Sequence, residues 1–199
     1  MSDTVLLTSE LLGSYETRLR SAGVLVDEAP APRSRTDQDE ITRPLGLVLS
    51  EEARLWWGWH DGSSGWWRGN CLGFCGDGFT SLERAVKLAT ELRGVAEEFT
   101  EEVDEAGELL DRAWLPFAET RYAITIDCGD DPGAPSPVRN IAFEDWSSVR
   151  QVVAPSLGTL VTWWCEAIDN GGWVWDTAAS EWVTDKERMN PELVKVGTW

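Results

Sequence analysis

Residues 44–62 read PLGLVLSEEARLWWGWHDG, and this segment is the most informative one for the fold that we expect. An apolar lead-in precedes Ser50, which stands where the N-cap of a helix belongs. Glu51 and Glu52 follow in the first turn, where carboxylates suit the helix dipole. The helix ends in aromatic residues. The triplet His60-Asp61-Gly62 then predicts a tight turn in which Asp caps the backbone and Gly takes a positive φ.

The sequence before this stretch predicts one helix and a linker. Apolar residues recur at helical spacing between Ser9 and Gly23, and glycine is a natural stop. Residues 28–37 have the proline-rich, polar composition of a linker or exposed loop. We therefore expect residues 1–39 to form an N-terminal helix and a linker that leads into the domain body.

The middle of the chain predicts a helix followed by strands. The helix is expected over residues 81–93, and strands are expected over 114–117, 122–127 and 138–143. The last two strands read as a hairpin with a long loop, since residues 129–135 have turn composition.

Two further helices are expected. Residues 97–111 hold eight acids and no base, and their apolar residues recur every three or four positions, which predicts an acidic amphipathic helix over 95–112. Ser156 caps a second helix that ends at Asn170-Gly171-Gly172. A pair of short strands around residues 178–180 and an arm packed by Trp199 complete the chain.

The charge and tryptophan content of the chain indicate what kind of partner it binds. The 199 residues include 17 bases and 35 acids, for a net charge of −18. Such a charge repels phosphate backbones and anionic membrane surfaces, so we expect neither nucleic acid nor a membrane as the partner. It favours basic proteins, because opposite fields speed encounter. Of the 13 tryptophans, most are expected in the core and roughly two to four on the surface as partner anchors.

The N-terminus shows no export signal. Residues 1–7 lack both a positively charged region and an apolar run of sufficient length. The longest uncharged stretch, residues 151–165, is too short to span a bilayer. We therefore expect a cytoplasmic protein whose four cysteines are reduced thiols.

The sequence carries no catalytic signature. His60 is the one histidine, so a triad would have to use it as its base. His60 and Asp61 could act as a general acid–base pair, but the turn is the favoured interpretation. A nucleophile elbow, a phosphate-binding loop and a dinucleotide fingerprint are missing. The sequence therefore predicts a protein that is not an enzyme and uses no cofactor.

Two groups of residues have metal-binding composition. Cys71 and Cys75 are spaced as zinc ligands, but a single pair is incomplete and buried thiols are favoured. Carboxylates near the predicted hairpin lack the spacing of a calcium loop, so solvated turn residues are favoured and no metal is expected. They are Asp127, Asp130, Asp131, Glu144 and Asp145.

The order of these motifs resembles the SUKH superfamily, which includes a fungal regulator of cell-wall synthesis and many bacterial immunity proteins. The matching segments are Leu45-Gly46, Leu49-Ser50, Trp56, His60-Asp61-Gly62, Trp114-Leu115-Pro116-Phe117, Ile124-Thr125-Ile126-Asp127, Pro137-Val138 and the helix start at Ser156-Leu157. Ser50 stands where the family often has proline.

The resemblance covers roughly residues 40–172. It implies a single α+β domain with a twisted, mainly antiparallel sheet and helices packed on it. Residues 95–112 are then an acidic helical insertion, and residues 173–199 are a C-terminal extension packed on the domain. The motif positions to which it assigns a structural role are Gly46, Trp56, His60, Gly62, Trp114, Pro116, Asp127 and Ser156.

The resemblance also implies a function, since many members are proposed to neutralise a cognate toxin, often a nuclease. We therefore expect an acidic, tryptophan-containing surface that binds a basic toxin. The candidate residues are Asp61, Trp66, Trp67, Asp130, Asp131, Glu144 and Asp145. Two alternatives stay open: a regulatory interaction module of a larger assembly, and a metal-dependent hydrolase built on His60, Asp61 and the Asp127–Asp131 cluster.

Overall fold

The computed structural model describes residues 4–63, 72, 78–99, 111–119, 123–141 and 151–196. The α-helices are α1 (Ser9–Ser21), α2 (Arg35–Thr42), α3 (Glu51–Trp59), α4 (Leu82–Phe99), α6 (Leu157–Asp169) and α7 (Pro191–Val196). The strands are β1 (Trp114–Glu119), β2 (Ala123–Asp127), β3 (Val138–Ile141), β4 (Val152–Ala154), β5 (Trp173–Asp176) and β6 (Glu181–Thr184). Short 3-10 turns are η1 (Val26–Glu28), η2 (Arg43–Leu45) and η4 (Lys186–Arg188). The predicted α+β fold is confirmed.

The main sheet is an antiparallel meander with strand order β1-β2-β3-β4. Ala123 pairs with Ile141 and Ile126 with Val138, which confirms the predicted hairpin. The register of β1 shifts between Pro116 and Ala118. This position suits proline, which cannot donate a ladder hydrogen bond and is tolerated in an edge strand or at a bulge.

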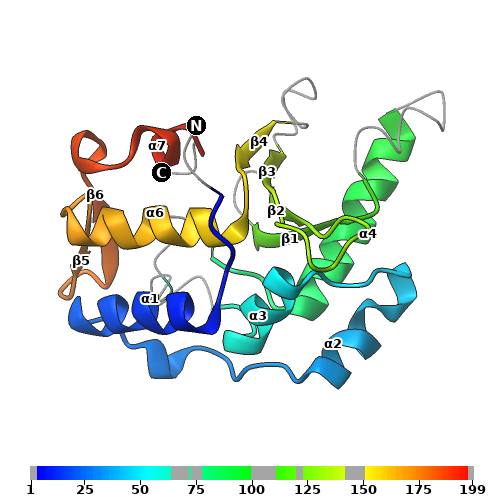
Figure 1. Cartoon of the computed structure of the whole chain (residues 1–199), viewed down its shortest axis with the longest axis horizontal. Helices are drawn as coiled ribbons and strands as arrows, with labels where there is room; N and C mark the ends of the chain where they lie inside the picture. The colour runs from blue at the N-terminus through cyan, green and yellow to red at the C-terminus, as the bar shows by residue number, and fades with distance from the viewer. Residues whose placement is uncertain are drawn as a thin grey trace.

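Helices α1 and α6 run side by side, and the hairpin of β5 and β6 lies at the opposite end of the molecule from α4 (Figure 1). Both helices begin at hydroxyl caps: the N–H of Leu11 donates to Thr8 and that of Thr159 to Ser156. The cap of α6 is the predicted one, and that of α1 lies one residue before the predicted start. Gly171, with φ +70°, ends the α6 region as its composition predicts.

Aromatic side chains form the centre of the core, because α1, α3 and α6 all direct apolar faces inward. The Trp56 ring lies 4.8 Å from that of Phe79, 5.6 Å from Phe117 and 6.0 Å from Trp164. A second apolar cluster joins Leu88 and Leu92 of α4 to the sheet. None of the described tryptophans is exposed, so the expected surface tryptophans are not found among them.

Three expectations about the chain's organisation need correction. The predicted linker ends at Ser34, whose hydroxyl accepts from the N–H of Asp37 and starts α2, so the border expected after residue 39 falls inside a helix. Helix α4 continues through residue 95 to Phe99, and residues 100–110 of the predicted acidic helix lie outside the described residues. The expected C-terminal arm contains α7, while Trp199 lies outside them too.

Within the described ranges, no helix is both long enough and apolar enough to cross a bilayer.

Candidate functional site

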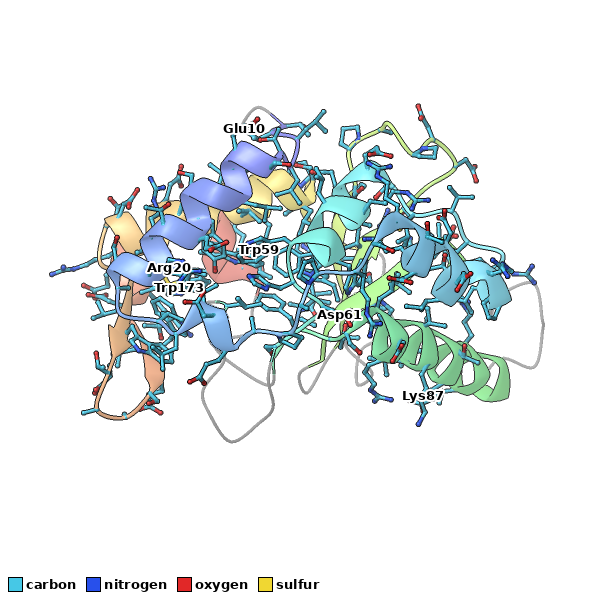
Figure 2. The ribbon with its side chains drawn as sticks, turned by 90° about the horizontal axis from the view of Figure 1, so that it is seen from below. Glu10, Arg20, Trp59, Asp61, Lys87 and Trp173 are labelled. Atoms are coloured by element: carbon cyan, nitrogen blue, oxygen red, sulfur yellow. The ribbon has the colours of Figure 1, made fainter. Side chains whose placement is uncertain are left out.

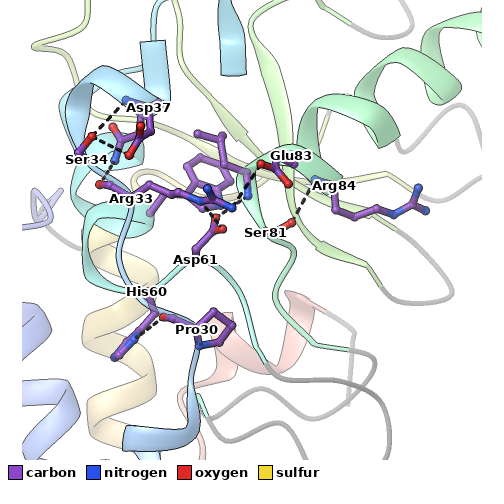
Figure 3. A network of polar contacts seen from close by, with 12 residues as sticks. Pro30, Arg33, Ser34, Asp37, His60, Asp61, Ser81, Glu83 and Arg84 are labelled. Atoms are coloured by element: carbon purple, nitrogen blue, oxygen red, sulfur yellow. Dashed lines mark hydrogen bonds and ion pairs between the residues drawn. The ribbon is translucent and has the colours of Figure 1, made fainter. Parts of the chain in front are cut away.

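The turn at His60-Asp61-Gly62 serves the fold, and its Asp61 and Gly62 are buried. One carboxylate oxygen of Asp61 accepts from the Leu82 N–H (2.8 Å) at the start of α4, and the other accepts from Nε of Arg33 (2.6 Å). Figure 3 shows this network, in which Arg33 also reaches Glu83. A carboxylate at a helix N-terminus meets unpaired N–H groups and the positive end of the dipole. Asp61 is 5 % exposed, so this candidate for partner binding does not lie on the described surface.

The conformation and the surroundings of Gly62 show why the turn needs glycine at this position. Its φ is +87°, and an added Cβ would lie 2.6 Å from the backbone nitrogen of Ser81. Any other residue would push the turn away from the start of α4. The structural role predicted for Gly62 is therefore confirmed, and the hydrogen bonds of Asp61 confirm that it caps backbone.

His60 is partly buried and contacts the backbone and an aromatic ring. Its Nδ1 lies 3.2 Å from the carbonyl oxygen of Pro30, and its ring lies edge-on to Trp59 at 4.6 Å. Since a carbonyl only accepts, Nδ1 carries the proton in this contact. Nε2 is buried and has no partner among the described residues. None of these contacts pairs the ring with a nucleophile.

A second buried carboxylate, Glu52, was missed by sequence reasoning. Its oxygens accept from the backbone N–H groups of Leu7 (2.6 Å), Gly158 (2.9 Å) and Ser136 (2.5 Å). The carboxylate thus joins the N-terminal arm (residues 4–8, before α1), the start of α6 and the β2–β3 loop to the first turn of α3. Hydrogen bonds to an ionised acceptor are about twice as strong as neutral ones.

The hydroxyls around Glu52 extend this junction. Ser136 donates to the Ser50 hydroxyl (2.6 Å), and Ser156 donates to the carbonyl of Val5 (2.5 Å). An added Cβ on Gly158 would overlap backbone atoms of Leu6 and Leu7. The N-terminal arm therefore lies directly on the start of α6. A glutamate one position after Glu51 in a capped helix gives no sequence signal for these distant partners.

The predicted hairpin loop is divided between paired and exposed acids. Asp127 pairs with Arg139 (3.1 Å), whose guanidinium carbon lies 4.6 Å from the ring centroid of Trp114. Asp130 and Asp131 are exposed, and Asp131 accepts from the N–H of Gly133 as turn residues do. Only these two of the predicted partner-binding residues are found on the described surface.

The remaining candidates lie outside the described residues: Trp66, Trp67, Cys71, Cys75, Glu144 and Asp145. Across the described ranges, no group of three or more His, Cys, Asp and Glu side chains is placed to hold a metal ion. Burial raises the pKa of the thiols of Cys128 and Cys165 to about 11, so both are poor nucleophiles.

The other motif residues occupy structural positions. Gly46 ends η2 with φ +63°, and Ser50 caps α3 by accepting from the Ala53 N–H. Trp56, Trp114 and Pro116 are buried, and Ser156 caps α6.

Cations on the described surface are largely engaged by acids. Figure 2 shows Lys87 projecting from the outer side of α4, where it pairs with Glu91. Ion pairs to carboxylates are formed by Arg18, Arg20, Arg33, Arg35, Arg54, Arg84, Lys87, Arg139, Arg188 and Lys195. Exposed acids that form no ion pair with a described residue include Glu10, Glu40, Asp130, Asp131, Asp176, Glu181 and Glu187. Across the part of the chain that the structure describes, the surplus negative charge therefore stands on the surface.

Comparison with known proteins adds no relative. No protein-family model matches the chain, and no curated protein matches it either. The resemblance to the SUKH superfamily stays a prediction that rests on the motifs themselves.

Proposed function

We propose that this chain is a non-enzymatic protein-binding domain of the immunity type, which neutralises a basic toxin, such as a nuclease, through an acidic surface. The observation that carries the proposal is the division of its carboxylates. Asp61 and Glu52 are buried in structural contacts, whereas Asp130, Asp131 and Asp176 are exposed and form no ion pair with a described residue. A net charge of −18 attracts a basic partner and speeds encounter.

The placement of the candidate catalytic groups supports the same proposal. His60 faces a backbone carbonyl, and both oxygens of Asp61 accept hydrogen bonds within the fold. A general base must reach the proton that it removes, so this pair is poorly placed for acid–base chemistry. The resemblance to a superfamily with many immunity proteins points in the same direction, as an analogy.

Co-expression with the product of the adjacent gene tests the proposal. We expect that product to stop growth when produced alone and growth to recover when this chain is produced with it. A second test uses a variant with charge reversals on the surface, which keeps the buried carboxylates and should protect less well. Its substitutions are Asp130→Lys, Asp131→Lys, Asp176→Lys and Glu181→Lys. A harmless neighbour, or toxicity that this chain leaves unchanged, contradicts the proposal.

A further inference from the structure

The hairpin of β5 and β6 has two different faces. Trp173, Trp175 and Trp182 share one face, and the Trp175 ring packs edge-on to that of Trp182 at 5.3 Å. This face joins the core through Trp173, whose ring centroid lies 6.3 Å from that of Trp164. The hairpin is therefore a rigid platform, and rigidity lowers the cost of binding.

The outer face combines apolar and acidic side chains. Val174 and Val183 lie directly opposite each other and are 54 % and 51 % exposed. The next pair on this face is Asp176 and Glu181, both exposed. Like charges directly opposite each other in a sheet are destabilising. The side chain of Asp176 has a local role, because it accepts from the N–H groups of Ala178 and Ala179. Glu181 has no such bond among the described residues.

The backbone of β5 leaves one edge of the hairpin open. Asp185 donates to the carbonyl of Gly172 (2.8 Å), its directly opposite residue. Hydrogen-bonded and non-bonded pairs alternate along an antiparallel ladder. The N–H and C=O of Trp175 therefore point away from β6. Within the described residues, no backbone or side-chain group forms a hydrogen bond with them.

A groove of about 460 Å³ follows this edge. Its walls come from α1, α6 and β5, and they include Thr17, Ser21, Ile168, Asp169, Val174 and Trp175. Because Val174 and Trp175 belong to opposite faces of β5, a space that both line runs along the edge of the strand. The groove thus leads an incoming chain to the open N–H and C=O of Trp175.

We propose that β5 receives an extended segment of a basic partner protein as an added strand. The inference rests on the proposed function and names its docking surface. Adding a strand to a sheet edge gains main-chain hydrogen bonds, and alternate side chains set the specificity. The four residues of β5 offer about 13 Å of edge.

Charge identifies the occupant. Residues 166–188 contain six acids and two bases. Arg18 also lines the groove, where it pairs with Asp169 (2.8 Å). In the added strand, the residue beside Val174 should carry an apolar side chain on the outer face. The residue two positions away, beside Asp176, should carry Lys or Arg on the same face. A second copy of this chain fits poorly, because each copy carries −18 and the two repel.

A peptide titration followed by NMR tests the inference. The probe is an acetylated and amidated Lys-Thr-Val-Thr-Lys peptide, which has the required spacing in either strand direction. We expect saturable shifts in the amides of β5, with that of Trp175 among the largest. Loss of binding is expected when the same peptide carries N-methyl groups on its two threonines and central valine, or glutamates in place of its lysines. Shifts centred elsewhere, or equal binding by all three peptides, overturn the inference.

Two matched variants localise the site. Thr17→Trp places a large side chain in the groove from an exposed position on α1, and we expect binding about tenfold weaker. Val48→Trp adds the same side chain at a valine that is 59 % exposed and does not line the groove, and binding should be unchanged. Equal effects of the two variants contradict the inference, as does a dimer in light scattering that Thr17→Trp abolishes.

Failure of this inference is separable from failure of the proposed function. If toxin neutralisation survives Thr17→Trp, the immunity function stands and the β5 surface is wrong. If the peptide adds to β5 but no toxin is neutralised, the strand-addition surface stands and the immunity function is wrong.

Discussion

The carboxylates of the α3 region and those of the β5–β6 hairpin have opposite environments. Glu52 is 3 % exposed and accepts from three backbone N–H groups contributed by distant segments. Asp176 and Glu181 face each other across an exposed ladder pair. The first arrangement stabilises the fold, whereas the second gives up some stability and leaves negative charge on the surface. Acidic residues in this protein therefore have two roles, which burial separates.

Glu52→Gln should have the largest effect on stability. The amide keeps one acceptor oxygen but turns an NH₂ group toward a backbone N–H, and the acceptor loses its charge. We expect the free energy of unfolding to fall by about 3 to 5 kcal/mol, measured by urea denaturation. Glu51→Gln is the control, because that exposed carboxylate pairs only with Arg35 in the described structure and should cost less than about 1 kcal/mol. Equal losses would remove the distinction between the two roles.

Asp61→Asn comes next. The Leu82 N–H keeps a neutral acceptor, while Arg33 loses the nearer of its two charged partners and keeps Glu83. Because the Arg33 side chain is 32 % exposed, water compensates in part. We expect a loss of about 2 kcal/mol in the same denaturation experiment. An unchanged free energy of unfolding would show that the turn does not depend on the carboxylate.

Two glycine substitutions distinguish the packing of the N-terminal arm on α6 from the general effect of helix propensity. Gly158→Ala would force Leu6 and Leu7 away from α6, and we expect a loss of about 1 to 3 kcal/mol together with faster hydrogen exchange at Leu7. Gly13→Ala meets no atom within 4 Å in α1 and should stabilise the protein by about 0.5 to 1 kcal/mol. The same sign for both changes would mean that the arm is not held on α6.

Glu181→Lys should have the smallest effect on stability. Unlike the substitutions of Glu52, Asp61 and Gly158, it should stabilise the protein. It replaces a like-charge pair with an attractive one, so we expect a gain of about 0.2 to 1 kcal/mol by denaturation. The same change should weaken binding to a basic partner, because a cation then stands on the docking surface. If this variant is less stable and binds the basic partner more tightly, the roles assigned to the buried and the exposed carboxylates are contradicted.

The sequence predicted elements whose signals are local. The helices capped at Ser50 and Ser156 follow from their caps and apolar spacing, and the β2–β3 and β5–β6 hairpins follow from strand patterns around turn residues. Helix α2 has a cap at Ser34 but lacks the apolar spacing, because its buried residues are the polar Gln38 and Thr42. Short α7 likewise carries too few residues for a clear period.

The site was harder to predict because its contacts are distant in sequence. The turn at Asp61 was foreseen from composition, but its burial depends on Arg33 and Leu82, 28 and 21 residues away. Glu52 meets Ser136 and Gly158, 84 and 106 residues away. No local pattern distinguishes such a carboxylate from an exposed one. Asp130 and Asp131 stay candidates for partner binding, because turn composition places them on the surface.

The most direct measurement is the association rate of this protein with the adjacent gene's product, followed by tryptophan fluorescence as salt is raised. We expect fast association at low salt and a fall of about tenfold or more near 0.5 M salt, where surface charges are screened. Glu181→Lys should slow association at low salt, with little effect at high salt. An association rate that changes neither with salt nor with this substitution would contradict the proposed acidic docking surface.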